Sequence, residues 1–360
     1  MKGSVRRPTQ VTPTGRNKRT SLKDLAAYLK VDPSTVSVVL NDVPGRSISQ
    51  QTRERIKAAA RLFNYSPSLL ARSLRQQDTR MVGVLLPVVG EEYHAQVLGG
   101  VASELERNRY SYLIAQHWHS QDKLRDYIEV LISRGVQGFI VIDTHLTSEL
   151  HVPGVAVAGH KRIPDVTNVM LNHQLAATLT MQHLHELGHR RIAVIRGQPA
   201  SSDSDIRWAA TSAAAKQFEL EIPRKLVMQL DRDVPSPELG YTIAQKLMKE
   251  SMDFTAIVCF NDIAALGAIR AVGDAGLRTP EDISVIGFDD IRMSVFARPS
   301  ITTIRQPLQQ MGETAAKILL ERLKGEHLGH DVAVEPELIV RESTGKAPHR
   351  PLARRSAIRA

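Results

Sequence analysis

The chain has 360 residues, of which 42% are hydrophobic and 24% charged, and its net charge is +9. These proportions are ordinary for a water-soluble globular protein, and the length suits two or three folded units. The single cysteine, Cys259, excludes an intramolecular disulfide framework. No uninterrupted apolar run reaches the roughly 18 residues of a membrane helix. The basic N-terminus lacks the apolar stretch of a secretory signal, so we expect a cytoplasmic protein.

Positive charge is concentrated at the two ends of the chain. Residues 1–20 contain six Lys/Arg and no acid, residues 21–80 contain ten against five acids, and residues 345–360 contain five and no acid. The remaining body, residues 81–344, therefore carries a net charge of −7. A basic first quarter on an acidic body is expected when one end contacts a polyanion such as DNA. Two solvated basic tails without a partner are the alternative.

Residues 1–19 show no apolar periodicity, and we expect a disordered basic arm there. Apolar residues then recur at helical spacing through SLKDLAAYLK: Leu22, Leu25, Ala26 and Leu29. Asp32 is a suitable N-cap, and Pro33 suits the first position of a second helix. Two short helices joined by about three residues are typical of a helix-turn-helix.

The second helix, within VDPSTVSVVLN, has a small and polar first turn. Small side chains allow a helix N-terminus to approach base edges and phosphates in the major groove. Pro33, Ser34 and Val38 point away from the apolar face and are predicted to contact bases. Thr35, Ser37 and Asn41 are predicted to contact the DNA backbone. An ordinary helical hairpin is the alternative that spacing alone leaves open.

Ser49 can cap a third helix, QQTRERIKAAARLFNY, and a short helical segment follows near Pro67. The succession SLKDLAAYL, VSVVLN, SxxTRERI and NYxPxxxARSL resembles the DNA-binding headpiece of the lactose/galactose repressor family. The resemblance implies that residues 66–78 form a hinge helix that folds on the operator. It also implies that Leu74 wedges into the minor groove, with Ala71 and Arg72 beside it.

Three positions depart from the pattern of that family. Lys30 stands where glycine is usual in the turn, and Asp32 stands where Ser or Thr is usual. Val38 replaces an arginine that commonly reads guanine. Valine cannot make the bidentate contact to guanine O6 and N7, but it can pack on a thymine methyl group. We therefore predict an operator that differs from the family consensus at that step.

Residues 81–344 alternate short apolar runs with amphipathic helices. The runs include MVGVLLPVV, YSYLIAQ, GFIVID, RIAVIRG, TAIVCF and ISVIGF, and the helices are expected near 91–107, 121–133, 204–218 and from 262. This alternation predicts parallel sheets covered on both faces, arranged as two lobes.

Ligands of such sheets bind at the carboxyl ends of the strands. Asn261 follows TAIVCF, Asp289 follows VIGF, and Arg207 opens the helix after RIAVIRG. Each position also has a purely structural alternative, such as a helix start or a turn. The segments FNDIAALGAIRA, DISVIGFDD, HELGHRRIAVIRG and RPSITTIRQP are similar to the effector lobe of the same repressor family. The resemblance implies that Arg207, Asn261 and Asp289 hydrogen-bond a small polar effector between the lobes.

An arginine, an amide and a carboxylate together can satisfy several ring hydroxyl groups, which suits a sugar. A nucleobase or a phosphorylated sugar fits the same residue types. Tyr93 and Trp118, with His117, lie at the ends of predicted elements of the first lobe. They are candidates for an aromatic stacking face.

The sequence gives little support to a metal site or to an enzyme. His183, His185 and His189 are closely spaced in HLHELGH, but Gly188 reads as a helix C-cap, which favours structural histidines over a metal site. No G-x-G-x-x-G follows the first apolar run, and no phosphate-binding loop or hydrolase elbow occurs. We expect no enzyme, no metal and no cofactor, and we expect Cys259 to be inert core.

The sequence thus predicts a multidomain protein with a small all-α helix-turn-helix headpiece (20–65), a hinge (66–78) and a disordered basic tail (345–360). The α/β two-lobed, periplasmic-binding-protein-like (type I) effector and dimerisation domain spans 79–344. The predicted function is a DNA-binding repressor that binds a palindromic operator as a homodimer and responds allosterically to a small effector. The alternatives are a cytoplasmic solute-binding protein and a constitutive DNA binder.

Overall fold

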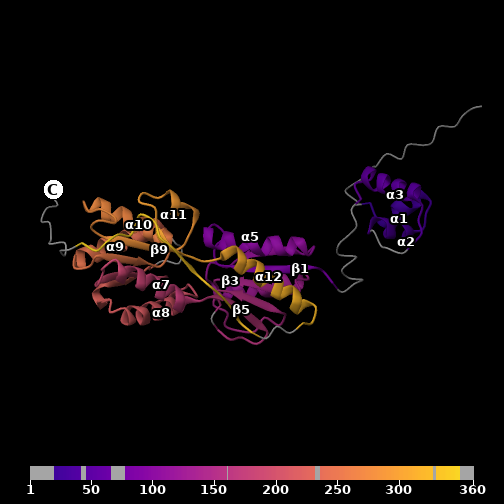
Figure 1. Cartoon of the computed structure of the whole chain (residues 1–360). Coiled ribbons are helices and arrows are strands. Elements are labelled where there is room, and N and C mark those ends of the chain that lie inside the picture. Colours follow the sequence, from indigo (N-terminus) through magenta and orange to yellow (C-terminus); the bar gives the residue numbers. More distant parts are fainter. Residues whose placement is uncertain are drawn as a thin grey trace, which may run out of the picture. The chain divides into compact units, whose positions relative to one another are not determined.

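The computed structural model describes residues 20–41, 46–65, 78–159, 161–231, 236–326 and 330–348. The chain divides into two compact units, Met1–Thr79 and Arg80–Ala360 (Figure 1). The predicted arm lies outside the described residues, as do most of the predicted hinge and tail. The domain boundaries expected from the sequence therefore stay predictions.

The described residues of the first unit form three helices, α1 (Leu22–Leu29), α2 (Pro33–Leu40) and α3 (Gln50–Leu62). Each begins at a side-chain cap: Ser21 forms a capping box with Asp24, Asp32 accepts a hydrogen bond from Ser34 N at 2.7 Å, and Ser49 accepts one from Thr52 N. The predicted caps at Asp32 and Ser49 are confirmed.

The turn between α1 and α2 is made without glycine. Lys30 has a φ of 54° and lies in the left-handed region at the end of α1. Side chains at helical spacing on the three helices form one core: Leu25, Ala26, Leu29, Val36, Val39, Ile56, Ala59 and Ala60. The apolar residues that recur at helical spacing in the sequence therefore form the inner face of this unit.

In the second unit, lobe 1 has a six-stranded parallel sheet in the order β11-β5-β4-β3-β1-β2. Its strands are β1 (Met81–Leu86), β2 (Ser111–Gln116), β3 (Gly138–Ile142), β4 (Gly154–Val157), β5 (Val166–Leu171) and β11 (Val332–Val334). Its helices are α5 (Glu92–Arg107), α6 (Gln121–Ser133) and α12 (Leu308–Leu323). Strands β3 and β4 are buried along their whole length, as expected for a sheet covered on both faces.

Lobe 2 has a six-stranded sheet in the order β12-β10-β9-β8-β6-β7, parallel except where β12 joins β10. Its strands are β6 (Ile192–Arg196), β7 (Val227–Gln229), β8 (Ala256–Cys259), β9 (Ser284–Asp289), β10 (Thr302–Arg305) and β12 (Glu337–Ile339). Its helical segments are α7 (His173–Glu186), α8 (Ser204–Gln217), η1 (Arg224–Leu226), α9 (Pro237–Glu250), α10 (Asp262–Asp274) and α11 (Arg292–Phe296).

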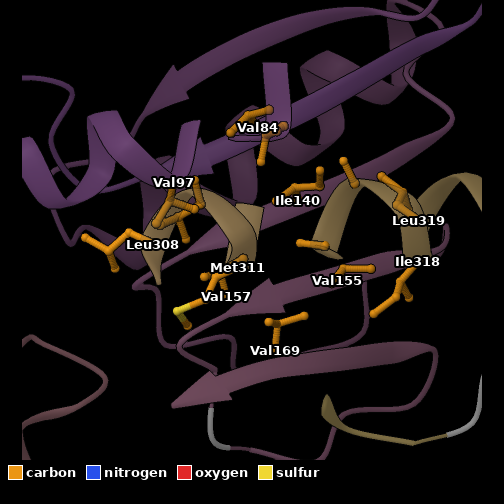
Figure 2. Packing of buried hydrophobic residues seen from close by; sticks show 14 of the residues in the cluster. Val84, Val97, Ile140, Val155, Val157, Val169, Leu308, Met311, Ile318 and Leu319 are labelled. Carbon is orange, nitrogen blue, oxygen red and sulfur yellow. The ribbon is translucent and has the colours of Figure 1, made fainter. Parts of the chain in front are cut away.

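The chain passes between the lobes more than once. After lobe 2, α12 returns to lobe 1 and packs beside α5 (Figure 1), and the chain then ends on lobe 2 through β12. Figure 2 shows Leu308 and Met311 of α12 near Val97 of α5, with Leu319 farther along α12 beside the same core of lobe 1. A Cβ added to Gly312 would lie 2.0 Å from Val97 O, so glycine permits this close helix contact.

Among the described residues, no helix is long and apolar enough to cross a membrane.

Candidate functional site

The first candidate surface is the outer face of α2. Pro33 and Ser34 are exposed at its N-terminus, whereas Val36 and Val39 are buried against α1 and α3. Val38 is half-buried, on the side away from the core positions. The helix thus separates a core face from a face with small side chains, which is what close approach to a DNA groove requires.

Two of the predicted backbone-contacting residues bond to each other. Asn41 Nδ2 donates to Ser37 O at 2.8 Å and to Ser37 Oγ at 3.3 Å. Thr35 is half-buried in the first turn of α2. The hydrogen bonds that Asp32 accepts from Ser34 hold the pKa of its carboxyl group below the ordinary value. The predicted DNA contacts at Ala71, Arg72 and Leu74 lie outside the described residues.

The second candidate site is a cavity of about 40 Å³ between the two lobes. Lobe 1 supplies five of its lining residues: Glu91, Tyr93, His94, His119 and Asp143. Lobe 2 supplies seven: Gln198, Ser201, Asp203, Arg207, Phe260, Asn261 and Asp289. Most of these residues follow the carboxyl ends of β1, β2, β3, β6, β8 and β9, where parallel sheets bind ligands.

Arg207 is the central cation of the lobe 2 wall. Its guanidinium group donates to Asp203 Oδ2 at 2.7 Å and to Phe260 O at 3.0 Å, and it lies 4.0 Å from Asp289 Oδ1. It is stacked between the rings of Phe260 and Phe288 at 4.5 and 3.9 Å. Burial would lower the pKa of Arg207, but Asp203 and Asp289 outweigh it and raise the pKa. The buried Nε has no hydrogen-bond partner in the described part of the chain.

Asn261 and Asp289 flank this cation. Asn261 caps α10 by accepting a hydrogen bond from Ala264 N at 2.9 Å. Asp289 has a φ of 107°, which aims its side chain into the cleft from the end of β9, and it accepts a hydrogen bond from Gln306 at 2.6 Å. Burial raises the pKa of Asp289 well above its ordinary value.

The lobe 1 wall contains two carboxyl groups and an imidazole between them. His94 Nδ1 lies 3.5 Å from Glu91 and Nε2 lies 3.6 Å from Asp143. The ring is 2% exposed, and neither nitrogen has a hydrogen-bond partner among the described residues. Burial raises the pKa of Glu91 to about 7.

Asp143 also joins the lobes. Its Oδ1 accepts hydrogen bonds from Ser202 Oγ at 2.8 Å, Ser202 N at 3.1 Å and Ser201 Oγ at 3.3 Å, both serines coming from the loop after β6. Burial would raise its pKa, but His94 and Ser202 outweigh burial and hold the pKa below the ordinary value. A second link runs from Arg292 N to Glu92 Oε1 at 2.7 Å.

The comparisons with known proteins agree with this architecture. Residues 21–68 match the family described as bacterial regulatory proteins, lacI family, and residues 181–344 match the periplasmic binding protein-like domain. The HTH-type transcriptional repressor PurR of Salmonella newport is 31% identical over 340 residues, covering 92% of this chain and 98% of that repressor. The chain belongs to the LacI family.

Solved structures of LacI-family proteins have the same fold. The Lac repressor dimer bound to operator and the anti-inducer ONPF superposes with a TM-score of 0.81 at 25% identity, covering 91% of this chain and all of that one. A complex of the transcriptional regulator CelR with cellobiose gives a TM-score of 0.68 at 26% identity, covering 90% and 100% of the two chains. The predicted fold class and family are therefore confirmed. These relatives are transcriptional regulators rather than enzymes.

The structure brings together four of the five predicted effector residues of this LacI-family chain: Tyr93, Arg207, Asn261 and Asp289. Trp118 is 54% exposed and does not line the cavity, which its neighbour His119 reaches instead. Both have left-handed backbone angles, with φ of 54° and 56°, so the loop turns sharply there. His117 is buried and hydrogen-bonds Thr144 at 2.9 Å, away from the lining. The roles of these residues in binding stay predictions.

Asp262 and the three histidines His183, His185 and His189, at the end of α7 and just after it, have structural roles. Asp262 is fully buried and accepts hydrogen bonds from Ile291 N, Ser294 Oγ and Thr303 Oγ1. His183 bonds Thr344, His185 bonds Phe218 O, and His189 bonds Thr255, Ser284 and Gly345 O. Partners this scattered do not converge on a common ion, which agrees with the structural reading of HLHELGH. Cys259 is buried in β8, and burial raises its pKa.

Proposed function

We propose that this chain is a transcriptional repressor that binds a palindromic operator as a homodimer and changes its DNA affinity when a small polar effector enters the cleft. The observation that carries the proposal is the presence, on one chain, of a helix-turn-helix unit and a cleft where Arg207, Asn261 and Asp289 face lobe 1. A protein with this function works in the cytoplasm on chromosomal DNA and is not an enzyme.

The headpiece reads DNA through α2 in this proposal. Pro33, Ser34 and Val38 contact bases, whereas Thr35, Ser37 and Asn41 contact the DNA backbone. Leu74 enters the minor groove with Ala71 and Arg72 beside it, as the family resemblance implies. The Lac repressor structure bound to operator supports this arrangement by its likeness to the chain.

Exposed apolar side chains support the homodimer. On α11, Met293, Val295 and Phe296 are 52%, 54% and 71% exposed. On the edge strand β2, Tyr112 and Ile114 are 36% and 41% exposed. Three exposed apolar side chains on one short helix form a local cluster, which suits an association surface, and a second copy that covers it would bring two headpieces to two half-sites.

The construction of the cleft supports an allosteric response. Its lining comes from both lobes, and Asp143 of lobe 1 accepts hydrogen bonds from Ser201 and Ser202 of lobe 2. An effector that parts the walls would change this contact between the lobes. An effector that binds one arrangement of the lobes better than the other shifts the population between them, and with it the DNA affinity.

The deciding experiment selects bound sequences from a random duplex library with the purified full-length protein. We expect a palindrome with a flexible central step and with thymine rather than a strong guanine preference opposite Val38. Val38→Ala should relax the preference at that position alone. A strong G·C preference there would contradict the role of Val38, and recovery of no motif with and without a metabolite mixture would overturn the proposal.

Two alternatives give different outcomes in the same assays. A solute-binding protein would bind small polar compounds but select no DNA sequence. A constitutive DNA binder would select an operator whose affinity no compound changes. Light scattering of the protein with Phe296→Glu tests the dimer, because a charge on this exposed side chain should shift the wild-type dimer towards monomer.

A further inference from the structure

The cleft lining contains more carboxyl groups than cations. Glu91, Asp143, Asp203 and Asp289 supply four carboxyl groups, and Arg207 is the one guanidinium group among the described residues that line the cavity. The histidines of the lining are His94 and His119. With all four carboxyl groups ionised, one negative charge is in excess if both imidazoles are charged, and three if both are neutral. Without a ligand, part of this charge is held as protons, because burial raises the pKa of Asp289 and of Glu91.

The excess of carboxyl groups over cations is not spread evenly between the two lobes. On lobe 2, Arg207 pairs with Asp203 at 2.7 Å and lies 4.0 Å from Asp289, which also accepts from Gln306. On lobe 1, Asp143 accepts hydrogen bonds from Ser201 and Ser202, whose hydroxyl and amide groups carry no net charge. His94 lies 3.6 Å from Asp143 and 3.5 Å from Glu91, so one imidazole is shared by two carboxyl groups. A single imidazole can balance only one of them, so the lobe 1 wall has a carboxyl group in excess.

Glu91 is held by a long contact. Among the described residues, its carboxyl group lies 3.5 Å from His94 Nδ1, and this nitrogen makes no hydrogen bond. Its side chain is only 15% exposed, so water replaces little of the missing interaction. The raised pKa of Glu91, caused by burial, agrees with a carboxyl group that lacks a partner.

His94 shows that the same wall has unused hydrogen-bonding capacity. It is 2% exposed, lines the cavity, and lies between Glu91 and Asp143 with both nitrogens unpartnered among the described residues. Buried polar groups without partners are costly, so they mark places that a ligand completes. Two carboxyl groups and an imidazole in this arrangement suit a ligand group that donates hydrogen bonds and carries positive charge.

We propose that the effector is a polyol ring bearing one ammonium group, as in an amino sugar, and that this group lies between Glu91 and Asp143 while Arg207, Asn261 and Asp289 bind the ring hydroxyl groups. The inference rests on the proposed effector function and narrows it to one ligand class. It disfavours phosphorylated sugars, because a phosphate group would meet a surplus of negative charge and find Arg207 already paired.

The test is calorimetric titration of the full-length protein with matched triplets of compounds. Each triplet has one ring with a hydroxyl, an ammonium or a phosphate group: glucose, glucosamine and glucose 6-phosphate, and the corresponding galactose and mannose compounds. We expect an amine-bearing member to bind at least about tenfold more tightly than its hydroxyl analogue, as a partly buried ion pair allows. A hydroxyl or phosphate member that binds equally well or better overturns the proposal, and so does the absence of binding by every amine.

Two variants test whether the preference for an amine over its hydroxyl analogue arises at the lobe 1 wall. Glu91→Gln should lower the ratio of amine to hydroxyl affinity by about tenfold. Glu106→Gln, which removes an exposed carboxyl group from the same helix α5 outside the lining, should leave the ratio unchanged. An unchanged ratio in Glu91→Gln would overturn the role of Glu91.

A pH series separates charge recognition from loss of structure. Glu91 faces His94 on α5 and Asp143 after β3, and its pKa is about 7. Because only the ionised carboxylate attracts an ammonium group, amine affinity should rise between pH 5.5 and 7 in the wild type and less in Glu91→Gln. A wild-type affinity that falls over this range contradicts the inference. Operator binding measured on the same preparations distinguishes a wrong ligand class from a wrong function, since the first leaves sequence-specific DNA binding intact.

Discussion

The two walls of the cleft are built differently. On lobe 2, Arg207 is fixed by Asp203, Phe260 O and two aromatic rings, and Asp289 is fixed by Gln306. On lobe 1, Glu91 and His94 have short-range neighbours but no hydrogen bonds from their side chains among the described residues. The first wall is held by contacts within the chain, whereas Glu91 and His94 of the second wall have unused hydrogen-bonding capacity. In the function that we propose, ligand affinity depends on the first wall for geometry and on the second for discrimination between ligands.

The largest expected effect comes from removing the central cation of the lobe 2 wall. Arg207→Ala leaves buried Asp203 and Asp289 facing each other, so we expect the free energy of unfolding to fall by about 3 kcal/mol. Urea unfolding measures this change. The matched control is Arg270→Ala, which breaks an exposed pair with Asp274 and should leave the urea midpoint unchanged. Equal midpoints for the two variants would show that the lobe 2 wall is not fixed by Arg207.

Asp262, a buried carboxyl group of lobe 2, should make the free energy of unfolding depend on pH. Burial raises the pKa of Asp262 to about 6 from an ordinary 3.8. The folded state thus holds this proton more tightly than the unfolded state, and the contribution to stability is present below pH 4 and is lost as the pH rises to about 6. The unfolding free energy of wild type relative to Asp262→Asn should fall by about 2 kcal/mol over that window. A constant difference between the two proteins would contradict the raised pKa.

The support beneath the lobe 1 wall is the contact of α5 with α12. Gly312→Ala places a Cβ 2.0 Å from Val97 O, which forces the helices apart and should cost about 2 kcal/mol of unfolding free energy. Gly99→Ala is the control on α5, because nothing lies within 4 Å of its added Cβ. Alanine there should stabilise the helix by up to about 1 kcal/mol. A lower melting temperature for Gly99→Ala than for Gly312→Ala would contradict the close packing of α5 against α12.

The smallest effect is expected for the unpartnered imidazole. His94→Gln removes a buried imidazole that lies 3.5 Å from Glu91 and 3.6 Å from Asp143, but no hydrogen bond to a described residue, so unfolding free energy should fall by only about 1 kcal/mol. His189→Gln makes the contrast, since His189 bonds Thr255, Ser284 and Gly345 O and its loss should cost about 2 kcal/mol. Both variants are compared by urea unfolding at pH 7. A large loss for His94→Gln would mean that the lobe 1 wall is as fixed as the other.

The sequence predicts the lobe 2 wall better than the lobe 1 wall. Arg207, Asn261 and Asp289 follow apolar runs and repeat a family pattern, so the rule of strand carboxyl ends finds them. The same rule would have found Asp143, which directly follows GFIVI. The sequence signal for Asp203 is weaker. It consists of the spacing of four residues from Arg207 at the start of α8, which suits an ion pair. Glu91 and His94 beside Tyr93 have none, because nothing local distinguishes them from an ordinary helix start.

At the remaining positions, the tertiary structure decides a conformation that the sequence alone does not predict. Trp118 is turned outward by a loop with two successive left-handed residues other than glycine, which composition does not reveal. In the headpiece, the caps at Asp32 and Ser49 follow from local chemistry and are found as predicted. The left-handed Lys30 shows that a turn typical of glycine can form without it.

The path of the chain between the lobes has a consequence for synthesis on the ribosome. Lobe 1 begins at β1 but lacks α12 and β11 until residue 334 has been made, and the sheet of lobe 2 lacks β12 until residue 339. Neither half of the cleft can be completed before residue 334 has been made, whereas the three described helices of the headpiece are complete by residue 62. A chain truncated before α12 would carry a finished DNA-reading unit without a finished effector-sensing unit.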